Sequence, residues 1–539
     1  MAAVCSGAAA VAGAQDASCV TDTLTAGFPA AWIGRRVGQI TVDASTVEAP
    51  PGVLGNLVRS LHSRTRLPIS MSEISVAPGA AVDSLEVLES VRRLRRTGLY
   101  SDVMLTGTRC GDDRLDLVAH TRDAWSLRAG ARYGRVSSRV AVSEVNLFGR
   151  AVTASLAAEH LYHRDALSVG LADSHLLGSH VRGSVLMRTY ADGRAWSWAV
   201  RSTNYSPRDV WRFSVRSDQL RRFREDVTTG EMEDLNRRTD AATVARRISV
   251  DDHRVYAFIL GVEHEQADLV VQQPQWRPGQ IAVSREFTAP LIGVARRSLD
   301  VGSIDWLVPG QLPAELPLGL EGELVTGVGH DLRSKSTIVH VDGWVGVTLK
   351  PTTHIVVTGD VWASGYYLPD SLFNGALRGS LSLYGHGRRG IWAMRMAGEQ
   401  LANPDPDVVA LSTIDPMLHS LAPSTRLAES AVMVSLERSV TLLSREGRWA
   451  VDAVPFVQYS QRNRSVNLAL AGPTYPRVLL VGIGWRRVRS QPTQAPLRFD
   501  IAKTVWESGG LPNRWVFVLS TQPWVALGRN RDGMRESVR

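Results

Sequence analysis

From Arg128 onward, apolar residues recur at every second position in one segment after another, and Gly, Asp, Asn and Pro separate these segments. Strict alternation predicts β-strands with one apolar and one polar face. The apolar faces include Trp211, Phe213, Val215, Val339, Val341, Val345, Val347, Leu349, Val432, Val434, Leu436, Val440, Phe499 and Ile501. The faces opposite them include Arg212, Arg216, His340, Asp342, Glu437, Arg498 and Asp500. Because these opposite faces carry charges, they cannot be a packed core.

The length of the alternating segments favours a membrane-crossing barrel over a soluble sandwich. Several segments run to ten or more residues, whereas sandwich strands average about five or six and a bilayer needs about nine to eleven. About 400 residues at roughly 25 per strand and loop predict an all-β antiparallel transmembrane barrel of roughly 16 strands. The longest polar interruptions, Arg221 to Arg238 and Ala402 to Thr425, are expected to be extracellular loops or a segment folded into the lumen.

The first part of the chain, from Trp32 to about Trp125, mixes helical and strand patterns. Asp83 is a helix N-cap and Gly98 a helix terminator. The expected elements, in chain order, are a strand at Val37 to Val47, helices at Val53 to Arg64 and Ser84 to Thr97, and strands at Leu99 to Leu105 and Arg114 to Thr121. This β-α-α-β-β order predicts a small α+β domain in front of the barrel.

Composition agrees with these two parts. The chain is 44% hydrophobic and 21% charged, which excludes a disordered protein, and it lacks the run of about 18 apolar residues that a transmembrane helix needs. Its 15 Trp outnumber its 11 Tyr and 10 Phe, as expected for a barrel with aromatic girdles. A net charge of +8 is too dilute over 539 residues to indicate nucleic-acid binding.

The two ends and the cysteines leave alternatives open. Met1 to Gln15 is a small-residue apolar stretch ending in Ala12-Gly13-Ala14, typical of a curtailed signal peptide or of a flexible Ala-rich end. Cys19 and Cys110 could form one disulfide, or the thiols could be unpaired. The domains are therefore expected at 1–31 (signal-like segment and linker), 32–125 (α+β domain), 126–527 (barrel) and 528–539 (polar tail).

The α+β segment resembles a POTRA domain, the periplasmic module of outer-membrane assembly and secretion barrels. The residues that carry the resemblance are Pro78, Gly79, Arg92, Leu94, Thr97, Gly98, Leu99, Tyr100, Asp102 and Val103. The resemblance implies that Arg92, Leu94, Gly98, Tyr100 and Asp102 mark a client-binding region. There an extended polypeptide would add to the exposed sheet edge. The alternative is a spacer that only holds the barrel.

The barrel segment is similar to the superfamily that includes BamA, TamA and the two-partner secretion transporters. Glu144-Val145-Asn146-Leu147-Phe148-Gly149-Arg150 resembles the start of its barrel, and Leu497-Arg498-Phe499-Asp500-Ile501-Ala502 resembles its penultimate strand. Leu377-Arg378-Gly379 is similar to the motif of a loop that folds into the lumen. The resemblance implies that Arg378 and Gly379 lie on that loop and that Glu437 on the barrel wall holds the arginine.

No catalytic motif supports an enzyme, and no set of residues indicates a metal or another cofactor. The resemblance implies a bacterial outer-membrane protein, with the POTRA-like domain in the periplasm, that assembles outer-membrane proteins or translocates polypeptides. Its partners would be outer-membrane lipid, an unfolded or extended client, and periplasmic proteins or lipoproteins, with no nucleic acid.

Three routes to function follow from this reading. A client could leave through a seam between a first strand near Val136 to Val142 and a last strand near Trp515 to Leu519. It could instead pass through the lumen after the Arg378 loop moves. The alternative is a passive pore or structural barrel with a periplasmic anchor domain.

Overall fold

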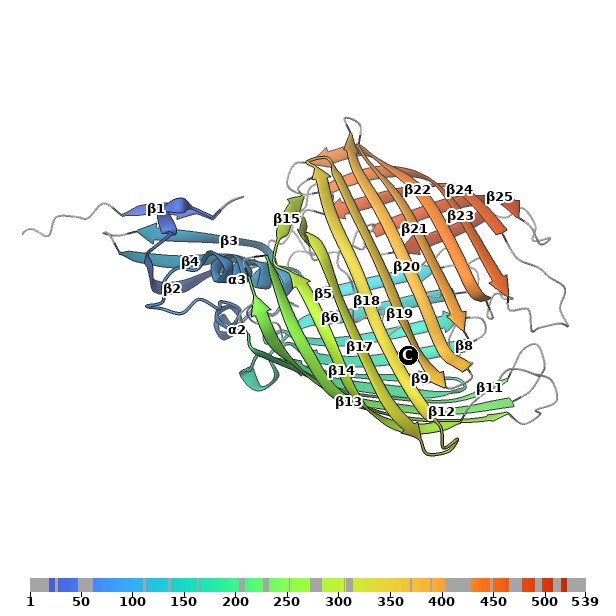
Figure 1. Cartoon of the computed structure of the whole chain (residues 1–539). Helices are drawn as coiled ribbons and strands as arrows, with labels where there is room; N and C mark the ends of the chain where they lie inside the picture. The colour runs from blue at the N-terminus through green and yellow to red at the C-terminus, as the bar shows by residue number, and fades with distance from the viewer. Residues whose placement is uncertain are drawn as a thin grey trace, which may run out of the picture.

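The computed structural model comprises an N-terminal α+β module and a large β-barrel, and the module lies beyond one open end of the barrel (Figure 1). We call this end the module side and the opposite end the far side. The structure describes residues 19–24, 28–46, 62–109, 113–133, 137–161, 164–202, 209–225, 232–251, 253–271, 284–304, 306, 314–368, 371–387, 390–402, 428–445, 449–464, 477–489, 497–507 and 515–520.

The module is a four-stranded sheet with two helices. The sheet order is β1 (Val20–Thr23), β3 (Tyr100–Arg109), β4 (Arg114–Asp123) and β2 (Arg36–Ser45). The β3 and β4 strands form an antiparallel hairpin, and β2 runs parallel to β4. These three strands confirm the strands predicted from the sequence, whereas β1 was not predicted.

The helices of the module are α2 (Leu67–Ser72) and α3 (Ser84–Arg96). The Asp83 carboxylate accepts a hydrogen bond from the Leu85 amide, which confirms the predicted N-cap. Gly98 has a φ of 68°, the left-handed conformation that commonly ends a helix. Most of the predicted helix at Val53 to Arg64 lies outside the described residues. The helices and sheet bury one core, which includes Trp32, Val87, Val91, Leu94, Leu99, Tyr100, Leu115 and Leu117.

Twenty described strands close into an antiparallel barrel. They are β5 (Leu127–Tyr133), β6 (Ser137–Leu147), β7 (Val152–Leu161), β8 (Arg164–Asp173), β9 (Val181–Tyr190), β10 (Gly193–Ser202), β11 (Trp211–Glu225), β12 (Met232–Val250), β13 (Arg254–Val271), β14 (Arg285–Ser298), β17 (Gly319–Asp331), β18 (Thr337–Thr352), β19 (Ile355–Leu368), β20 (Ser371–Gly387), β21 (Gly390–Ala402), β22 (Ala428–Arg445), β23 (Trp449–Arg464), β24 (Arg477–Arg489), β25 (Leu497–Glu507) and β26 (Trp515–Ser520).

The prediction of an antiparallel β-barrel is confirmed, but the expected number of roughly 16 strands is wrong. Many hairpin connections are short, such as the two residues between β19 and β20, so each strand and its loop use fewer residues than assumed. The predicted loop at Arg221 to Arg238 is largely strand, because β11 continues to Glu225 and β12 begins at Met232. The other predicted loop, Ala402 to Thr425, falls almost entirely outside the described residues.

The alternation predicted from the sequence separates an inner from an outer face. Side chains from non-neighbouring strands can meet only inside the barrel, and Arg498 of β25 reaches Glu437 of β22 in this way. The opposite face of each strand therefore points outward, and it carries the exposed apolar residues Trp211, Phe213, Val215, Leu260, Val294, Val345, Val361, Leu377, Leu381, Val432, Leu436, Val481 and Phe499. The lumen is polar and the outer face is apolar.

A small hairpin narrows the barrel on the module side. Strands β15 (Val301–Ile304) and β16 (Ala314–Pro317) pair with each other rather than with the wall. Ile304 and Leu316 pack with Val356 and Tyr384 of the inner wall, and the Trp306 indole donates a hydrogen bond of 2.8 Å to the Thr353 carbonyl. In Figure 1, β15 lies at the end of the barrel that faces the module. Among the described residues, no helix is long and apolar enough to cross a bilayer.

Candidate functional site

The residues predicted for client binding prove to be mainly structural. Leu94 and Tyr100 are buried in the module core, and the Tyr100 hydroxyl bonds to the Ser70 hydroxyl at 2.8 Å. Gly98 ends α3, and Arg92 lies 3.6 Å from Glu89 on the same helix. Among these five residues, only Asp102 is exposed. The motif thus has a role in the architecture of the module, and its role in client binding stays a prediction.

The edge of the module sheet at β3 is covered by the chain itself. Strand β1 pairs with Thr106 to Arg109 of β3, and the Leu24 amide extends this pairing by donating to the Leu105 carbonyl at 2.8 Å. Alternate carbonyls along a strand point to the same side. The next carbonyl on this edge, that of Val103, accepts a hydrogen bond of 3.1 Å from Arg95. An extended client would have to displace these groups. The edge at β2 has no partner strand among those described, and it is covered only at its start, where Val37 exchanges backbone hydrogen bonds with Gly79 and Ala80.

The covering strand is also held covalently. Cys19, one residue before β1, is disulfide-bonded. The register places Val20 opposite Arg109, one residue from each cysteine of the predicted Cys19–Cys110 pair. Cys110 itself lies outside the described residues. The pairing of Cys19 with Cys110 stays a prediction; such a bond would fasten the start of β1 to β3.

The module is joined to the barrel at the turn between β6 and β7. The Asn146 side chain donates to the Ser63 carbonyl and to the Thr65 hydroxyl, each at 2.9 Å, and accepts from the Ala151 amide at 3.0 Å. Gly149 has a φ of 71°, and a Cβ there would lie 2.2 Å from the Arg64 carbonyl oxygen. The Asn and Gly of the motif at residues 144–150 thus have a physical role, which is to let this turn dock against the module.

A second junction joins α2 and α3 to the turn between β8 and β9. The Glu73 carboxylate lies 3.1 Å from Nε of Arg93 on α3 and 3.0 Å from Nε2 of His175 in the turn. All three side chains are largely buried. Burial alone would raise the pKa of Glu73, but the His175 hydrogen bond and the Arg93 charge bring it below its ordinary value of 4.5. Glu73 is therefore ionised at neutral pH and links the two parts electrostatically.

Because its pKa is lower in the folded protein, Glu73 contributes stability that is present above pH 4.5 and is lost as the pH falls through its folded pKa. We expect the distance between spin labels at D102C and L177C to have a narrow distribution at neutral pH and to broaden below pH 4.5. The E73Q variant should show the broad distribution at both pH values. The matched control is E89Q, which alters an ion pair within α3 alone; equal behaviour of E73Q and E89Q would contradict the prediction.

The predicted contact between Arg378 and Glu437 is not formed. Arg378 and Gly379 lie within strand β20, not on a loop, and the Arg378 guanidinium pairs with Glu399 on the neighbouring strand β21. Arg378 also lies 5.4 Å from the centre of the Trp362 ring. Arg378 and Glu399 meet because of the register between β20 and β21, and the sequence motif alone does not reveal this register.

Glu437 instead belongs to a charged network on the inner wall of β22 to β25. It accepts two hydrogen bonds of 3.1 Å from Arg498, and Nε of Arg498 donates to Asp500 at 2.8 Å. Beside them, Arg486 pairs with Asp452 and donates to the Ser439 hydroxyl at 2.8 Å. The motif that contains Arg498 and Asp500 was identified in the sequence, but Arg498 was not identified as the partner of Glu437.

A second network lies inside the barrel near the far side and links β13 to β19. The Tyr366 hydroxyl of β19 donates to Glu263 at 3.0 Å and to Glu265 at 2.6 Å, both on β13. Arg285 pairs with Glu265 at 2.5 Å, and the His340 ring stacks on Tyr366 with 4.7 Å between centres. Three strands separate β13 from β19 in the wall, a path of about 20 Å between them. The wall must therefore curve tightly here, and these side chains narrow the lumen.

The barrel closes between its last and first described strands. The described pairing of β26 with β5 consists of Leu519 opposite Tyr133. With six and seven residues, β26 and β5 are the shortest strands of the barrel as described. The first strand is thus β5, whereas the segment predicted for it, Val136 to Val142, belongs largely to β6.

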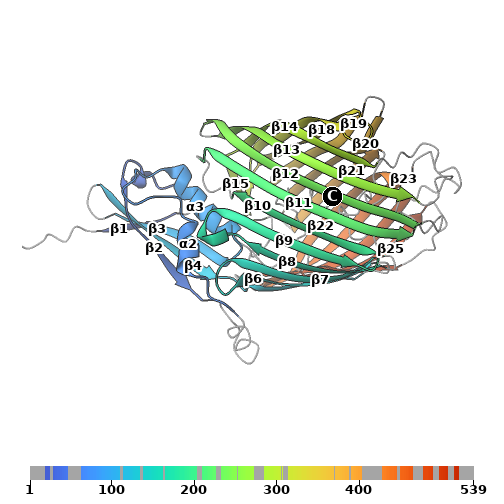
Figure 2. The same cartoon turned by 90° about the horizontal axis from the view of Figure 1, so that it is seen from below.

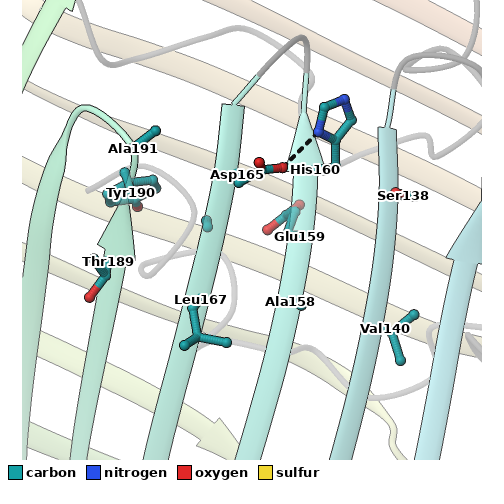
Figure 3. Close-up of a pocket in the computed structure, with 11 residues that line it drawn as sticks. Ser138, Val140, Ala158, Glu159, His160, Asp165, Leu167, Thr189, Tyr190 and Ala191 are labelled. Atoms are coloured by element: carbon teal, nitrogen blue, oxygen red, sulfur yellow. Dashed lines mark hydrogen bonds and ion pairs between the residues drawn. The ribbon is translucent and has the colours of Figure 1, made fainter.

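A cavity of about 620 Å³ lies near the far side on β6 to β9 (Figure 3). Among the residues that line it, His160 Nδ1 and Asp165 Oδ1 are hydrogen-bonded at 2.8 Å. The exposed Val140 and Leu167 lie along its length. These apolar side chains belong to the outer face, so we assign the cavity to that surface.

The fold defines the class of the protein: a closed β-barrel with an N-terminal α+β module docked at one end. No family model and no curated protein matches the sequence. Solved structures with similar arrangements include BamA from Haemophilus ducreyi lacking POTRA domains 1-3 (13% identity, 93% of this chain and 89% of that chain covered, TM-score 0.32). They also include CdiB from Acinetobacter baumannii (11% identity, 91% of this chain and 74% of that chain covered, TM-score 0.38). A third is CdiB from Escherichia coli (11% identity, 90% of this chain and 77% of that chain covered, TM-score 0.40). Scores this low assign neither a family nor a function.

Proposed function

We propose that the barrel spans the outer membrane of a bacterium and that the module lies in the periplasm. The outward face of the strands is apolar while the inner face carries paired charges, which is the arrangement that a bilayer requires. Most barrel strands have ten or more residues, long enough to cross the hydrocarbon core when tilted. Among the described strands, each barrel strand has a neighbour on both sides, and the pairing of β26 with β5 consists of a single described pair.

We further propose that this protein assembles outer-membrane proteins or translocates polypeptides, with an extended client captured on the module sheet. Strand addition uses main-chain hydrogen bonds and makes few demands on client sequence. The covered edge at β3 argues that the client adds at β2. The partners of the protein are then the client, outer-membrane lipid, and periplasmic proteins or lipoproteins that deliver the client.

One observation carries the proposal: the module docks on the turns that follow β6 and β8, immediately beyond the first barrel strand. Asn146 and His175 make these contacts. Figure 2 shows the module next to the same end of β6 to β9. A client held by the module would therefore lie close to the seam between β26 and β5. We propose that the seam opens to release client strands into lipid.

The structure favours this route over the two alternatives. Passage through the lumen was linked to movement of an Arg378 loop, but Arg378 is part of a wall strand. A wide passive pore is disfavoured by the Tyr366 network, which projects into the lumen between β13 and β19, and by the β15–β16 hairpin, which packs against the inner wall.

Depletion of the protein in its host, with quantitative proteomics of outer-membrane and secreted fractions, tests the proposal. We expect a loss of other outer-membrane barrels if the protein inserts them. Loss of one secreted or surface protein would identify dedicated export. An unchanged proteome would contradict both activities and leave the passive barrel as the better account.

A further inference from the structure

Four arginines lie on the outer face of the barrel, in the module-side half of their strands. Each follows an exposed apolar residue by two positions and so shares its outward face. They are Arg246 after Val244 on β12, Arg296 after Val294 on β14, Arg438 after Leu436 on β22, and Arg487 after Trp485 on β24. We call these four residues the arginine rim.

Each arginine of the rim has an aromatic neighbour. The Arg246 guanidinium lies 5.4 Å from the centre of the Trp211 ring, and that of Arg296 lies 5.9 Å from the Tyr256 ring. Arg438 is directly opposite Trp392 in the register of β21 and β22, and Trp485 precedes Arg487 by two residues. Tryptophan and tyrosine concentrate where a membrane protein passes from hydrocarbon to headgroups. The rim therefore lies at the depth of the headgroups.

The rim is not neutralised by the protein. Within the described part of the chain, no carboxylate forms an ion pair with any of the four arginines, and Nε of Arg296 is buried without a hydrogen-bond partner. Other arginines near the two ends of the barrel are paired: Arg238 with Asp240 at 2.7 Å and Arg333 with Asp268 on the far side, and Arg254 with Asp251 at 3.0 Å on the module side. The four rim arginines differ from these because no described carboxylate pairs with them.

We propose that the arginine rim binds the phosphate groups of anionic phospholipids in the membrane leaflet that faces the module. This inference rests on the proposed membrane-spanning orientation. Arg246 and Arg296 are two strands apart, about 10 Å, so their long side chains can converge on one headgroup while their methylene groups contact the acyl region. The aromatic rings restrict the guanidinium groups and so lower the entropy lost on binding.

The test uses the full chain reconstituted into vesicles of phosphatidylcholine that contain spin-labelled phosphatidylglycerol or spin-labelled phosphatidylcholine. Electron paramagnetic resonance then gives the affinity of the barrel for the anionic lipid relative to the neutral one. We expect a clear preference for phosphatidylglycerol. The R246Q/R296Q variant should weaken binding at this site about fivefold for each arginine removed. The matched control is R238Q/R333Q, which removes two far-side arginines and should retain the preference.

Folding of each variant is checked by the altered gel mobility of unheated barrel. An inserted R246Q/R296Q barrel with the wild-type lipid preference would overturn the proposal, as would an equal loss in the control variant. Failure of the wild-type chain to insert into vesicles would instead contradict the membrane-spanning orientation. A defect in client assembly without any change in lipid preference would concern the proposed assembly activity and would leave the lipid-binding proposal unaffected.

Discussion

A disulfide that joins the last barrel strand to the first will abolish activity if clients leave through the seam. The Y133C/L519C variant places the cysteines at the described pair between β5 and β26, and directly opposed residues have the Cα separation that a disulfide requires. We expect oxidised cells that depend on this variant to lose the client as completely as depleted cells do. Adding a reductant should restore it.

The control is V140C/A158C, which joins the neighbouring strands β6 and β7 at an opposed pair. This bond leaves the seam free and should have no effect. Full activity of the oxidised Y133C/L519C variant would rule out lateral opening and favour passage through the lumen. Equal loss in both variants would show that cross-linking any part of the wall is harmful.

Removing Arg486 should cause the largest loss of stability. Its guanidinium pairs with the buried Asp452 carboxylate and with the Ser439 hydroxyl. An R486M variant leaves Asp452 buried without its main counter-charge, and breaking a buried pair in this way costs about 3–5 kcal/mol. Urea unfolding of the reconstituted chain, followed by tryptophan fluorescence, measures the change.

Two further variants separate charge from packing. R487Q alters the adjacent residue on the outer face. In vesicles of phosphatidylcholine without anionic lipid, this variant should leave the unfolding midpoint nearly unchanged. The double variant D452N/R486M removes the uncompensated charge and should recover much of the loss. If R486M were no less stable than R487Q, the inner network would not support the wall.

The parts of the fold that depend on short-range patterns could be predicted from the sequence. Outward Val345 and inward His340 follow from alternation, because successive side chains of a strand always point to opposite faces. The Asp83 cap and the Gly98 terminus follow equally from residues close together in the chain. These features need no knowledge of which strands are neighbours.

The parts that depend on strand register could not be predicted. Arg378 pairs with Glu399 because β20 and β21 are aligned in one particular way, and Glu437 meets Arg498 across two intervening strands. The covering of β3 by residues 20–23 was also missed, since a four-residue strand carries too little pattern to identify. Motif resemblance singled out Arg378 and Glu437, but in the structure Arg378 pairs with Glu399 and Glu437 pairs with Arg498.

The turn between β6 and β7 also constrains the order in which the chain can fold. Its left-handed residues Phe148, Gly149 and Ala151 are stabilised by contacts that Asn146 makes with Ser63 and Thr65, more than 80 residues earlier. Those earlier residues belong to the module, which has its own core and emerges first during synthesis. The folded module can therefore act as a template on which the second and third barrel strands nucleate. The remaining strands would then add in sequence, so that the closing contact between β26 and β5 is the last to form.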